Sequence, residues 1–566
     1  MSSGRFPVVL LWHMHQPQYR DALTGVSILP WTYLHAIKDY VDMAAHLEAN
    51  PGARAVVNFT PVLIEQLEDL SRRVQQHLQH GTDLPDPVLA SLGPAGLPAD
   101  PGGRLTLMQA CLRAHRVNLI ERYPDYRRLA DLALALGTRE TIGYANDQYL
   151  RDLAVWFHVA WLGETVKRED ARVARLIERG HDFGPADCRS LLELIGALLG
   201  GVLPRYRRLM ERGQVELSAS PYGHPILPLL IDFQAAREST PDAPLPHAAN
   251  YPGGAERAGW HLDESRAVFT RVFGGPAQGC WPSEGAISTP ALALIEQHGM
   301  RWAATSESVL RGCLEERGEL VAATEESPVT RLYRQPGHAL NLLFRHDELS
   351  DLIGFTYSKW HGDDAVRHFV EQLEHLARRQ NADGTRLVLI ALDGENAWDY
   401  YPFNGFYFLQ GLYRALASHP LLELTTPAEF LKRAPVASAL PRVVAGSWVH
   451  GTLSTWIGDP DKNRGWDRLV EAKQAYDRVM AAGTLSVEQR HLAERQLALC
   501  ESSDWFWWFG DYNPYEAVRD FDALFRHQLA CLYQLLQLPV PANLSATISV
   551  GRGVPEAGGV MRRAQD

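Results

Sequence analysis

The chain has 566 residues, 46% of them hydrophobic and 22% charged, which is the composition of a water-soluble globular protein. A chain of this length can bury one large core together with a smaller domain. Its formal net charge is −12 at pH 7 and no long basic run appears, so we predict neither a nucleic-acid partner nor a membrane partner.

The six cysteines are scattered without a CxxC or any paired spacing, which suits reduced thiols. The apolar stretch at the N-terminus is about five residues long before two histidines interrupt it, whereas a signal peptide needs roughly 7 to 15. No run of about 18 apolar residues occurs elsewhere. We therefore expect a cytoplasmic protein.

Short β-rich runs alternate with helical patterns along residues 1–433. Several of the runs are apolar throughout, as strands covered on both faces must be. Amphipathic helical stretches such as LIEQLEDLSRRVQQHL separate them, so strand, helix and strand alternate and predict a parallel sheet. The predicted strands are 8–12, 55–59, 215–219, the segment before 280–284, 301–305, 340–344, 387–392 and 422–426.

Polar and aromatic clusters follow five of these strands: WHMHQP, SPYGHP, WPSEGAIS, RHDELSD and DGENAW. An α/β barrel carries its active site at the C-terminal ends of successive strands, whereas an open doubly wound sheet gathers such residues at one switch point. No GxGxxG or P-loop follows any strand, which argues against a nucleotide site. We therefore expect a closed barrel over residues 1–433, with helical insertions at about 70–135 and 165–200.

The composition changes at the linker APVASALPRVVAG, residues 434–446, and the chain beyond it is mostly helical. We predict a helical domain over 434–545 and a poorly packed tail over 546–566. The helical part contains SSDWFWWFGDYN, with four consecutive aromatic residues. One helix distributes four such side chains around its axis, so some of them should face a groove or another domain.

Two acids at the ends of buried strands, Glu284 and either Asp393 or Glu395, suit the carboxyl pair of a glycosidase. Each lies close in sequence to a tryptophan, Trp281 or Trp398. One carboxylate would attack or stabilise the sugar cation, and one carboxylic acid would protonate the glycosidic oxygen. The alternative is that these acids cap helices or pair with arginines.

His13 and His15 alternate along a strand end, so their side chains should point to the same side. Together with His224 and a carboxylate they would suit zinc, or they would hold sugar hydroxyls as hydrogen-bonding groups. The aromatic run at Trp505–Trp508 is either packing between domains or a platform on which a pyranose ring stacks.

Five stretches, in this order, resemble the motifs of glycoside hydrolase family 57, which contains α-amylases, amylopullulanases, 4-α-glucanotransferases and branching enzymes. They are WHMHQP (12–17), GQVELSASPYGHPILPLL (213–230), WPSEGAIS (281–288), LDGENAW (392–398) and SSDWFWWFGD (502–511). The resemblance extends over nearly the whole chain.

The resemblance implies a (β/α)7 barrel, a helical domain that closes over its cleft, and a retaining reaction that needs no cofactor or metal. By motif position, Glu284 would be the nucleophile and Asp393 the general acid/base, with their carboxyl groups about 5 to 6 Å apart. The positions matching substrate contacts are His13, His15, Glu216, His224, Trp281, Glu395, Trp398, Asp504 and Trp507.

The resemblance further implies an α-glucan or maltooligosaccharide substrate with cleavage of α-1,4 and also α-1,6 bonds. DGENAWDYY and SDWFWWFGD look more like the amylase and amylopullulanase branch. A 4-α-glucanotransferase or branching enzyme with the same site is the alternative. More distant alternatives are a metal-dependent α-mannosidase or polysaccharide deacetylase, and a carbohydrate-binding protein without turnover.

Overall fold

A closed barrel of parallel strands forms the centre of the computed structural model, which describes residues 4–94, 96–318, 327–380 and 385–553. Neighbouring strands pair in chain order, and β7 also pairs with β8, which closes the ring. The expected (β/α)7 barrel is confirmed. Its seven described strands are β1 (Phe6–Met14), β2 (Ala55–Phe59), β3 (Val215–Ala219), β4 (Gly279–Cys280), β5 (Trp302–Ser306), β7 (Asn341–Arg345) and β8 (Val388–Asp393).

The barrel strands are apolar on both faces because the barrel interior covers one face and the helices cover the other. All nine residues of β1 are buried. The last predicted strand is β9 (Leu422–Leu424), which pairs with the first residues of β1 outside the ring. Two further strands, β6 (Tyr333–Arg334) and β10 (Ser438–Ala439), were not predicted, because two residues are too few to show a period.

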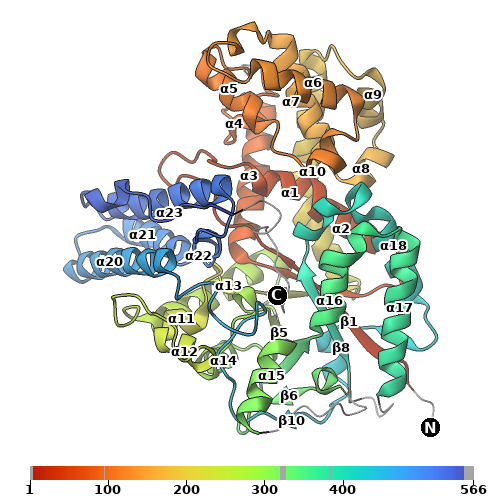
Figure 1. Ribbon diagram of the computed structural model, residues 1–566, viewed down its shortest axis with the longest axis vertical. Coiled ribbons are helices and arrows are strands. Elements are labelled where there is room, and N and C mark those ends of the chain that lie inside the picture. Colours follow the sequence, from red (N-terminus) through yellow and green to blue (C-terminus); the bar gives the residue numbers. More distant parts are fainter. Residues whose placement is uncertain (1–3, 95, 319–326, 381–384, 554–566) are drawn as a thin grey trace.

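Helices connect the strands and cover the outside of the barrel (Figure 1). These helices are α1 (Trp31–His35), α2 (Val41–Glu48), α13 (Gly254–Phe273), α14 (Thr289–Gln297), α15 (Glu307–Glu316), α16 (Asp347–Asp351), α17 (Gly362–Arg379), α18 (Phe406–Ala417) and α19 (Pro427–Leu431). Apart from α19, whose Phe430 packs with the side chains inside the barrel, their apolar faces belong to the same large core as the outward side chains of the strands.

A long helical insertion between β2 and β3 contains both expected insertions and extends beyond one end of the barrel (Figure 1). It returns to the barrel through α10, which packs against α2 and α3. Its helices are α3 (Pro61–His80), α4 (Pro87–Ala90), α5 (Pro101–Ala110), α6 (Pro124–Leu136), α7 (Asp147–Trp161), α8 (Glu164–Glu169), α9 (Ala171–Arg179) and α10 (Pro185–Glu211).

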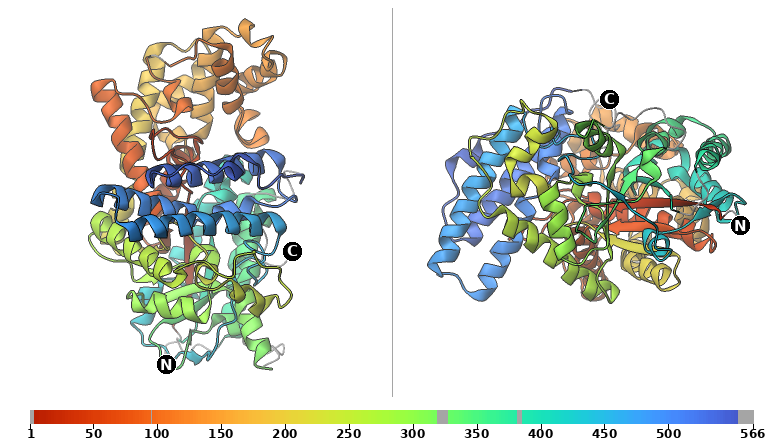
Figure 2. Two further views of the ribbon diagram at one scale, coloured as in Figure 1. Left: turned by 90° about the vertical axis from the view of Figure 1, so that its left-hand side faces the viewer. Right: turned by 90° about the horizontal axis from the view of Figure 1, so that it is seen from below.

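The C-terminal helices lie against the side of the barrel, as both views in Figure 2 show. They are α20 (Pro460–Ala482), α21 (Val487–Cys500), α22 (Asp504–Trp508) and α23 (Tyr515–Leu535). Their core also takes in the segment between β3 and β4 that contains α11 (Leu227–Ile231) and α12 (Ala236–Ser239). Trp466 of α20 lies between Phe233 of that segment, 5.1 Å away, and Phe506 of α22, which it stacks on at 4.3 Å.

Both edges of the expected helical domain differ in the structure. In the linker, β10 pairs with β6 and Gly446 pairs with Ile287, so this stretch is held against the barrel. The expectation of a poorly packed tail is wrong for residues 546–553, because the Asp522 carboxylate accepts hydrogen bonds from the backbone N–H groups of Ile548 and Ser549. The remainder of that tail lies outside the described residues.

All six cysteines are free thiols with buried side chains. Across the described ranges, no helix combines the length and the apolar character that crossing a membrane requires.

Candidate active site

The C-terminal ends of the barrel strands open into a cavity of about 780 Å³. The insertion and the C-terminal helices complete its walls with side chains such as Trp161 and Trp508. Of the eleven side chains predicted from the sequence, seven line it: His13, His15, Glu284, Asp393, Glu395, Asp504 and Trp507.

Barrel register places His13 directly beside Asp393. The two residues are partners across β1 and β8, and the N–H of Gly394 donates to the carbonyl of His13 at 2.7 Å. Asp393 is the last residue of β8, so its side chain lies at the cavity end of the barrel. Asn396 Nδ2 donates to the Asp393 carboxylate at 2.9 Å and fixes its orientation.

Glu284 lies in the short turn η5 (Ser283–Gly285) after β4, with a φ of +58° that L-residues rarely adopt. Such strain persists where surrounding contacts determine the conformation. Trp448 Nε1 donates to one carboxylate oxygen at 3.0 Å, and Ser503 Oγ donates to the other at 3.3 Å. The backbone N–H of Trp448 also donates to the Glu284 carbonyl at 3.1 Å. Both side-chain donors belong to the part of the chain that follows the barrel.

Burial raises the pKa of both carboxyl groups. The pKa of Glu284 rises to about 8, because burial and the nearby charges of Asp393 and Asp504 outweigh the hydrogen bonds that favour the anion. Burial likewise raises the pKa of Asp393 to about 6, against the opposing effect of its hydrogen bond from Asn396. Between about pH 6 and pH 8 these values leave one of the two carboxyl groups protonated, and Glu284 is the more basic of the two. Near pH 7 the proton therefore lies mainly on Glu284, so attack by Glu284 as the proposed nucleophile requires that the proton first pass to Asp393.

Three imidazole rings lie side by side at this end of the barrel. His15 stacks on His224 at 3.8 Å, and His13 lies 5.1 Å from His224. His13 Nδ1 lies 2.7 Å from Asn58 Oδ1, and burial lowers the pKa of His13 to about 3. His15 Nε2 lies 2.9 Å from the Asp504 carboxylate. Burial therefore keeps His13 neutral, and the contact with Asp504 joins His15 to the C-terminal helices.

His15, His224 and Asp504 offer ligand atoms within 4.8 Å of one another, the usual signature of a metal site. A metal binds a histidine in the plane of its ring, along the nitrogen lone pair. Rings that stack 3.8 Å apart with only 24° between their planes have no shared position where one ion satisfies both. As placed, this group does not fit a metal ion.

Three predicted side chains lie behind the cavity wall and do not line it. His224 is buried beneath His15, and its Nδ1 lies 2.9 Å from Ser503 Oγ. Trp281 is fully buried, with its ring 6.3 Å from that of His13. Trp398 Nε1 donates to the Gly394 carbonyl at 2.9 Å, which supports the loop after Asp393.

Glu216 does not lie at the cavity end of the barrel, where its motif position predicts a contact with the substrate. It is the second residue of β3, about 10 Å below the last residue of that strand at 3.3 Å per residue. Its carboxylate accepts hydrogen bonds from Trp302 Nε1 and from the N–H of Ala428, both at 2.8 Å. Glu216 does not line the cavity, and these contacts make it a structural carboxyl group that joins β3, β5 and α19.

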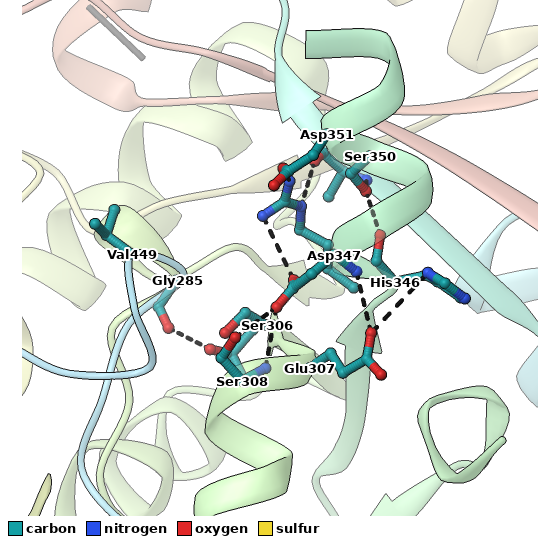
Figure 3. A network of polar contacts seen from close by, with 12 residues as sticks. Gly285, Ser306, Glu307, Ser308, His346, Asp347, Ser350, Asp351 and Val449 are labelled. Atoms are coloured by element: carbon teal, nitrogen blue, oxygen red, sulfur yellow. Dashed lines mark hydrogen bonds and ion pairs between the residues drawn. The ribbon is translucent and has the colours of Figure 1, made fainter. Parts of the chain in front are cut away.

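Arg345 lines the cavity and was not among the predicted site residues, although RHDELSD was noted as a strand-end cluster. Its Nε donates to the Ala391 carbonyl at 2.9 Å, and its guanidinium lies 5.5 Å from the Trp448 ring. Asp347 pairs with this guanidinium and accepts from Ser308 at 2.8 Å (Figure 3). The network therefore supports Trp448, whose indole donates to the proposed nucleophile.

The fifth sequence stretch divides its aromatic side chains as expected. Trp505 and Phe506 are fully buried in the core of the C-terminal helices, while Trp507 and Trp508 line the cavity. Asp504, at the start of α22, lines the same cavity. Helix α22 is therefore anchored in the core by Trp505 and Phe506, and it contributes Asp504, Trp507 and Trp508 to the cavity wall.

A buried ion cluster fixes the start of this stretch. Arg257 donates to the Glu501 carboxylate at 2.8 and 2.9 Å, and His261 Nε2 lies 2.8 Å from it. Burial opposes the charge of Glu501, yet these two partners outweigh it and lower its pKa to about 2. His261 Nδ1 also accepts from the N–H of Gly223 at 3.1 Å. Helix α13 therefore holds both the loop of His224 and the segment of Asp504.

A closed α/β barrel with two interacting buried carboxyl groups in a strand-end cavity is the arrangement of a glycoside hydrolase. The model of glycosyl hydrolase family 57 matches residues 9–441, and the chain belongs to this family. The protein is therefore a glycoside hydrolase or transglycosylase.

Solved structures with the same fold include a GH57 branching enzyme from Thermococcus kodakaraensis, at TM-score 0.59 and 16% identity, covering 94% of this chain and 90% of that one. A GH57-type branching enzyme from Pyrococcus horikoshii gives TM-score 0.57 and 15% identity, covering 98% and 100%. The α-amylase AmyC from Thermotoga maritima gives TM-score 0.53 and 14% identity, covering 94% of each chain.

The carboxyl pair predicts a bell-shaped dependence of kcat/KM on pH. Below about pH 6 both groups are protonated and no nucleophile remains, while above about pH 8 both are ionised and no acid remains. Measuring kcat/KM in steps across about pH 5 to 9 tests this. A kcat/KM that changes less than about twofold over that range contradicts the raised pKa values of this carboxyl pair.

The positions of Glu216 and Asp504 predict opposite effects for two isosteric variants. In Glu216→Gln, one amide –NH2 must face an N–H donor in either orientation, so we expect a loss of about 1–3 kcal/mol of stability with kcat/KM unchanged. In Asp504→Asn, we expect an unchanged Tm and a kcat/KM lower by about a hundredfold. Thermal melts and initial rates on both variants test this, and the reverse pattern would show that the two positions are wrongly assigned.

Proposed function

We propose that the protein is a retaining hydrolase of α-glucans, acting on starch, glycogen and maltooligosaccharides. It cleaves α-1,4 bonds, with α-1,6 bonds as an additional target. The observation that carries this proposal is the pair Glu284 and Asp393, two carboxyl groups with raised pKa values that line one cavity. Membership of family 57 supports it, and so do the branching enzyme and α-amylase activities named for similar folds.

In the first step, the Glu284 carboxylate attacks the anomeric carbon while Asp393 donates its proton to the glycosidic oxygen. The glycosidic bond breaks, the leaving sugar departs as an alcohol, and the retained sugar becomes an ester of Glu284. The donors Trp448 and Ser503 hold the attacking carboxylate in one orientation. Esterification removes the charge on Glu284, which lets Asp393 remain ionised.

In the second step, Asp393 takes a proton from water as the water oxygen attacks the anomeric carbon. The ester bond breaks and Glu284 leaves as a carboxylate, so the pair returns to its starting charge. Two inversions at one carbon give net retention of configuration. If a sugar hydroxyl attacks instead of water, the same ester bond breaks, the hydroxyl proton moves to Asp393, and the glycosyl group is transferred to that sugar.

The other cavity groups hold the sugar for in-line attack. Asp504 accepts hydrogen bonds from sugar hydroxyls while His15 fixes its orientation, and Trp507 packs against a ring face. Burial raises the pKa of Glu395 well above its ordinary value, and its Oε2 atom, which has no hydrogen-bond partner among the described residues, is left to bind a sugar hydroxyl. His13 supplies its remaining ring nitrogen as an acceptor.

The helical domain proposed for residues 434–545 is part of the working site. It supplies Trp448, Asp504 and Trp507 to the cavity wall and the buried Ser503 to the Glu284 carboxylate, whereas the carboxyl pair belongs to the barrel. We propose that this domain and the barrel of residues 1–433 act as one catalytic unit.

Transfer to a second glucan, as in a 4-α-glucanotransferase or a branching enzyme, is the alternative activity of this site. One observation favours it: Trp31 and Trp161, whose rings lie 6.0 Å apart, line the same cavity together with His115. Aromatic side chains there suit an acceptor sugar, which competes with water for the glycosyl ester.

Product analysis tests the reaction and its partition. On maltoheptaose and amylose, hydrolysis gives only shorter chains, whereas transfer also gives longer or branched ones, and pullulan reports on α-1,6 bonds. Proton NMR at early times should show the α-anomer as the first product. A β-anomer as the first product would contradict retention, and release of no sugar from any of the three would contradict the proposed substrate class.

Glu284→Gln should keep the fold and lose at least three orders of magnitude in kcat, because the amide is the same size but is no nucleophile. Glu211→Gln, on the exposed C-terminal end of α10, is the matched control and should match the parent. Initial rates on maltoheptaose and Tm are measured for both variants. Activity of Glu284→Gln within tenfold of the parent would exclude the assignment.

A further inference from the structure

Four exposed aromatic side chains lie on the segment that follows Asp393 and just before the neighbouring helix α17, and one of them lines the active-site cavity. We call Tyr400, Phe403, Tyr407 and Trp360 the aromatic track. They are 46%, 39%, 49% and 41% exposed, respectively, although aromatic residues of this size are usually buried. Tyr400 itself lines the cavity.

The order of the track follows from the chain and from close contacts. Tyr400 ends the turn η9 (Asn396–Tyr400), directly after the loop that carries Asp393, and Phe403 lies in η10 (Pro402–Gly405). The Phe403 ring lies 5.5 Å from that of Tyr407, in the first turn of α18. Trp360 lies two residues before Gly362, where an added Cβ would lie 3.1 Å from the Tyr407 Cβ. Helices α17 and α18 lie side by side here (Figure 1).

The turn that carries Phe403 is strained. Phe403 and Asn404 have φ values of +56° and +54°, a conformation that costs energy for residues other than glycine. Two partly buried hydrogen bonds hold it: Asn404 Nδ2 donates to Asp42 at 2.9 Å, and Lys38 Nζ donates to Asn404 Oδ1 at 3.1 Å. The fold therefore keeps this aromatic ring at the surface against the local preference of the backbone.

Arginines from the insertion hold two of the four rings, Phe403 and Tyr407, in place. The guanidinium of Arg122 lies 4.6 Å from the Phe403 ring, and Arg168 lies 5.1 Å from the Tyr407 ring and donates to its hydroxyl at 3.1 Å. Glu164, almost fully buried, binds Arg122 at 2.7 Å and Arg168 at 2.8 Å. Rings held in this way lose little freedom when a ligand binds, which favours binding.

We propose that the aromatic track binds the part of a long α-glucan chain that extends out of the active-site cavity. This inference rests on the proposed function, since the same polymer would occupy both places. Three observations favour a neutral polysaccharide: continuity with the cavity through Tyr400, rings available to pack on the apolar C–H faces of pyranoses, and a net charge of −12 that disfavours polyanions. The 88° angle between the Phe403 and Tyr407 rings suits a curved chain.

The track predicts a discrimination between long and short substrates. Phe403→Ala and Trp360→Ala each remove one side chain of the aromatic track, and neither Phe403 nor Trp360 lines the cavity. We expect each to lower kcat/KM on glycogen or amylose by about tenfold, and to leave kcat/KM on maltotetraose unchanged. Tyr144→Ala, which removes an aromatic ring that is 83% exposed on the insertion, is the matched control and should change neither.

A binding measurement separates the track from the catalytic site. In a Glu284→Gln background, retardation by glycogen in native gels should weaken about tenfold in the two track variants and remain unchanged with Tyr144→Ala. Unchanged retardation in the track variants overturns the proposal, and so does loss of a dimer in Phe403→Ala by size exclusion without any change in retardation. Weakened retardation in a protein that cleaves no α-glucan would support the track while contradicting the proposed function.

Discussion

The pairing of β7 with β8 is the constraint on which the site depends. It joins the last parallel strands through Arg345 and Leu389 and turns a twisted sheet into a ring. Only in a closed ring do the ends of β1, β4, β7 and β8 face a common centre. The buried carboxyl pair, the imidazoles and the guanidinium of Arg345 therefore share one cavity, although they are far apart in sequence.

The barrel does not complete the site by itself. Glu284 receives its two side-chain hydrogen bonds from Trp448 and Ser503, and His15 is joined to Asp504. These two hydrogen bonds favour the carboxylate form, although burial still raises the pKa of Glu284 to about 8. The part of the chain that follows the barrel thus moderates the pKa of a group that belongs to the barrel.

The apolar runs in the sequence predicted eight of the ten described strands because period and composition are local properties. The depth of a side chain in the barrel is not local, so the motif that contains Glu216 indicated the strand but not that this carboxyl faces away from the cavity end. Trp448 and Ser503 act through contacts with Glu284 more than 160 residues away in sequence, which no pattern reports. The split of the aromatic run at Trp505–Trp508 followed from helix geometry and was predictable.

The shared core of the C-terminal helices has a consequence for synthesis of the protein. Phe233 packs on Trp466, and Trp466 stacks on Phe506, so the apolar surface around Phe233 waits for partners made much later. At about 5–20 residues per second, the ribosome needs roughly 15 to 55 seconds to reach Phe506. During that interval the four remaining barrel strands are made while this apolar surface stays exposed, which makes the nascent chain a client for chaperones that shield apolar surface.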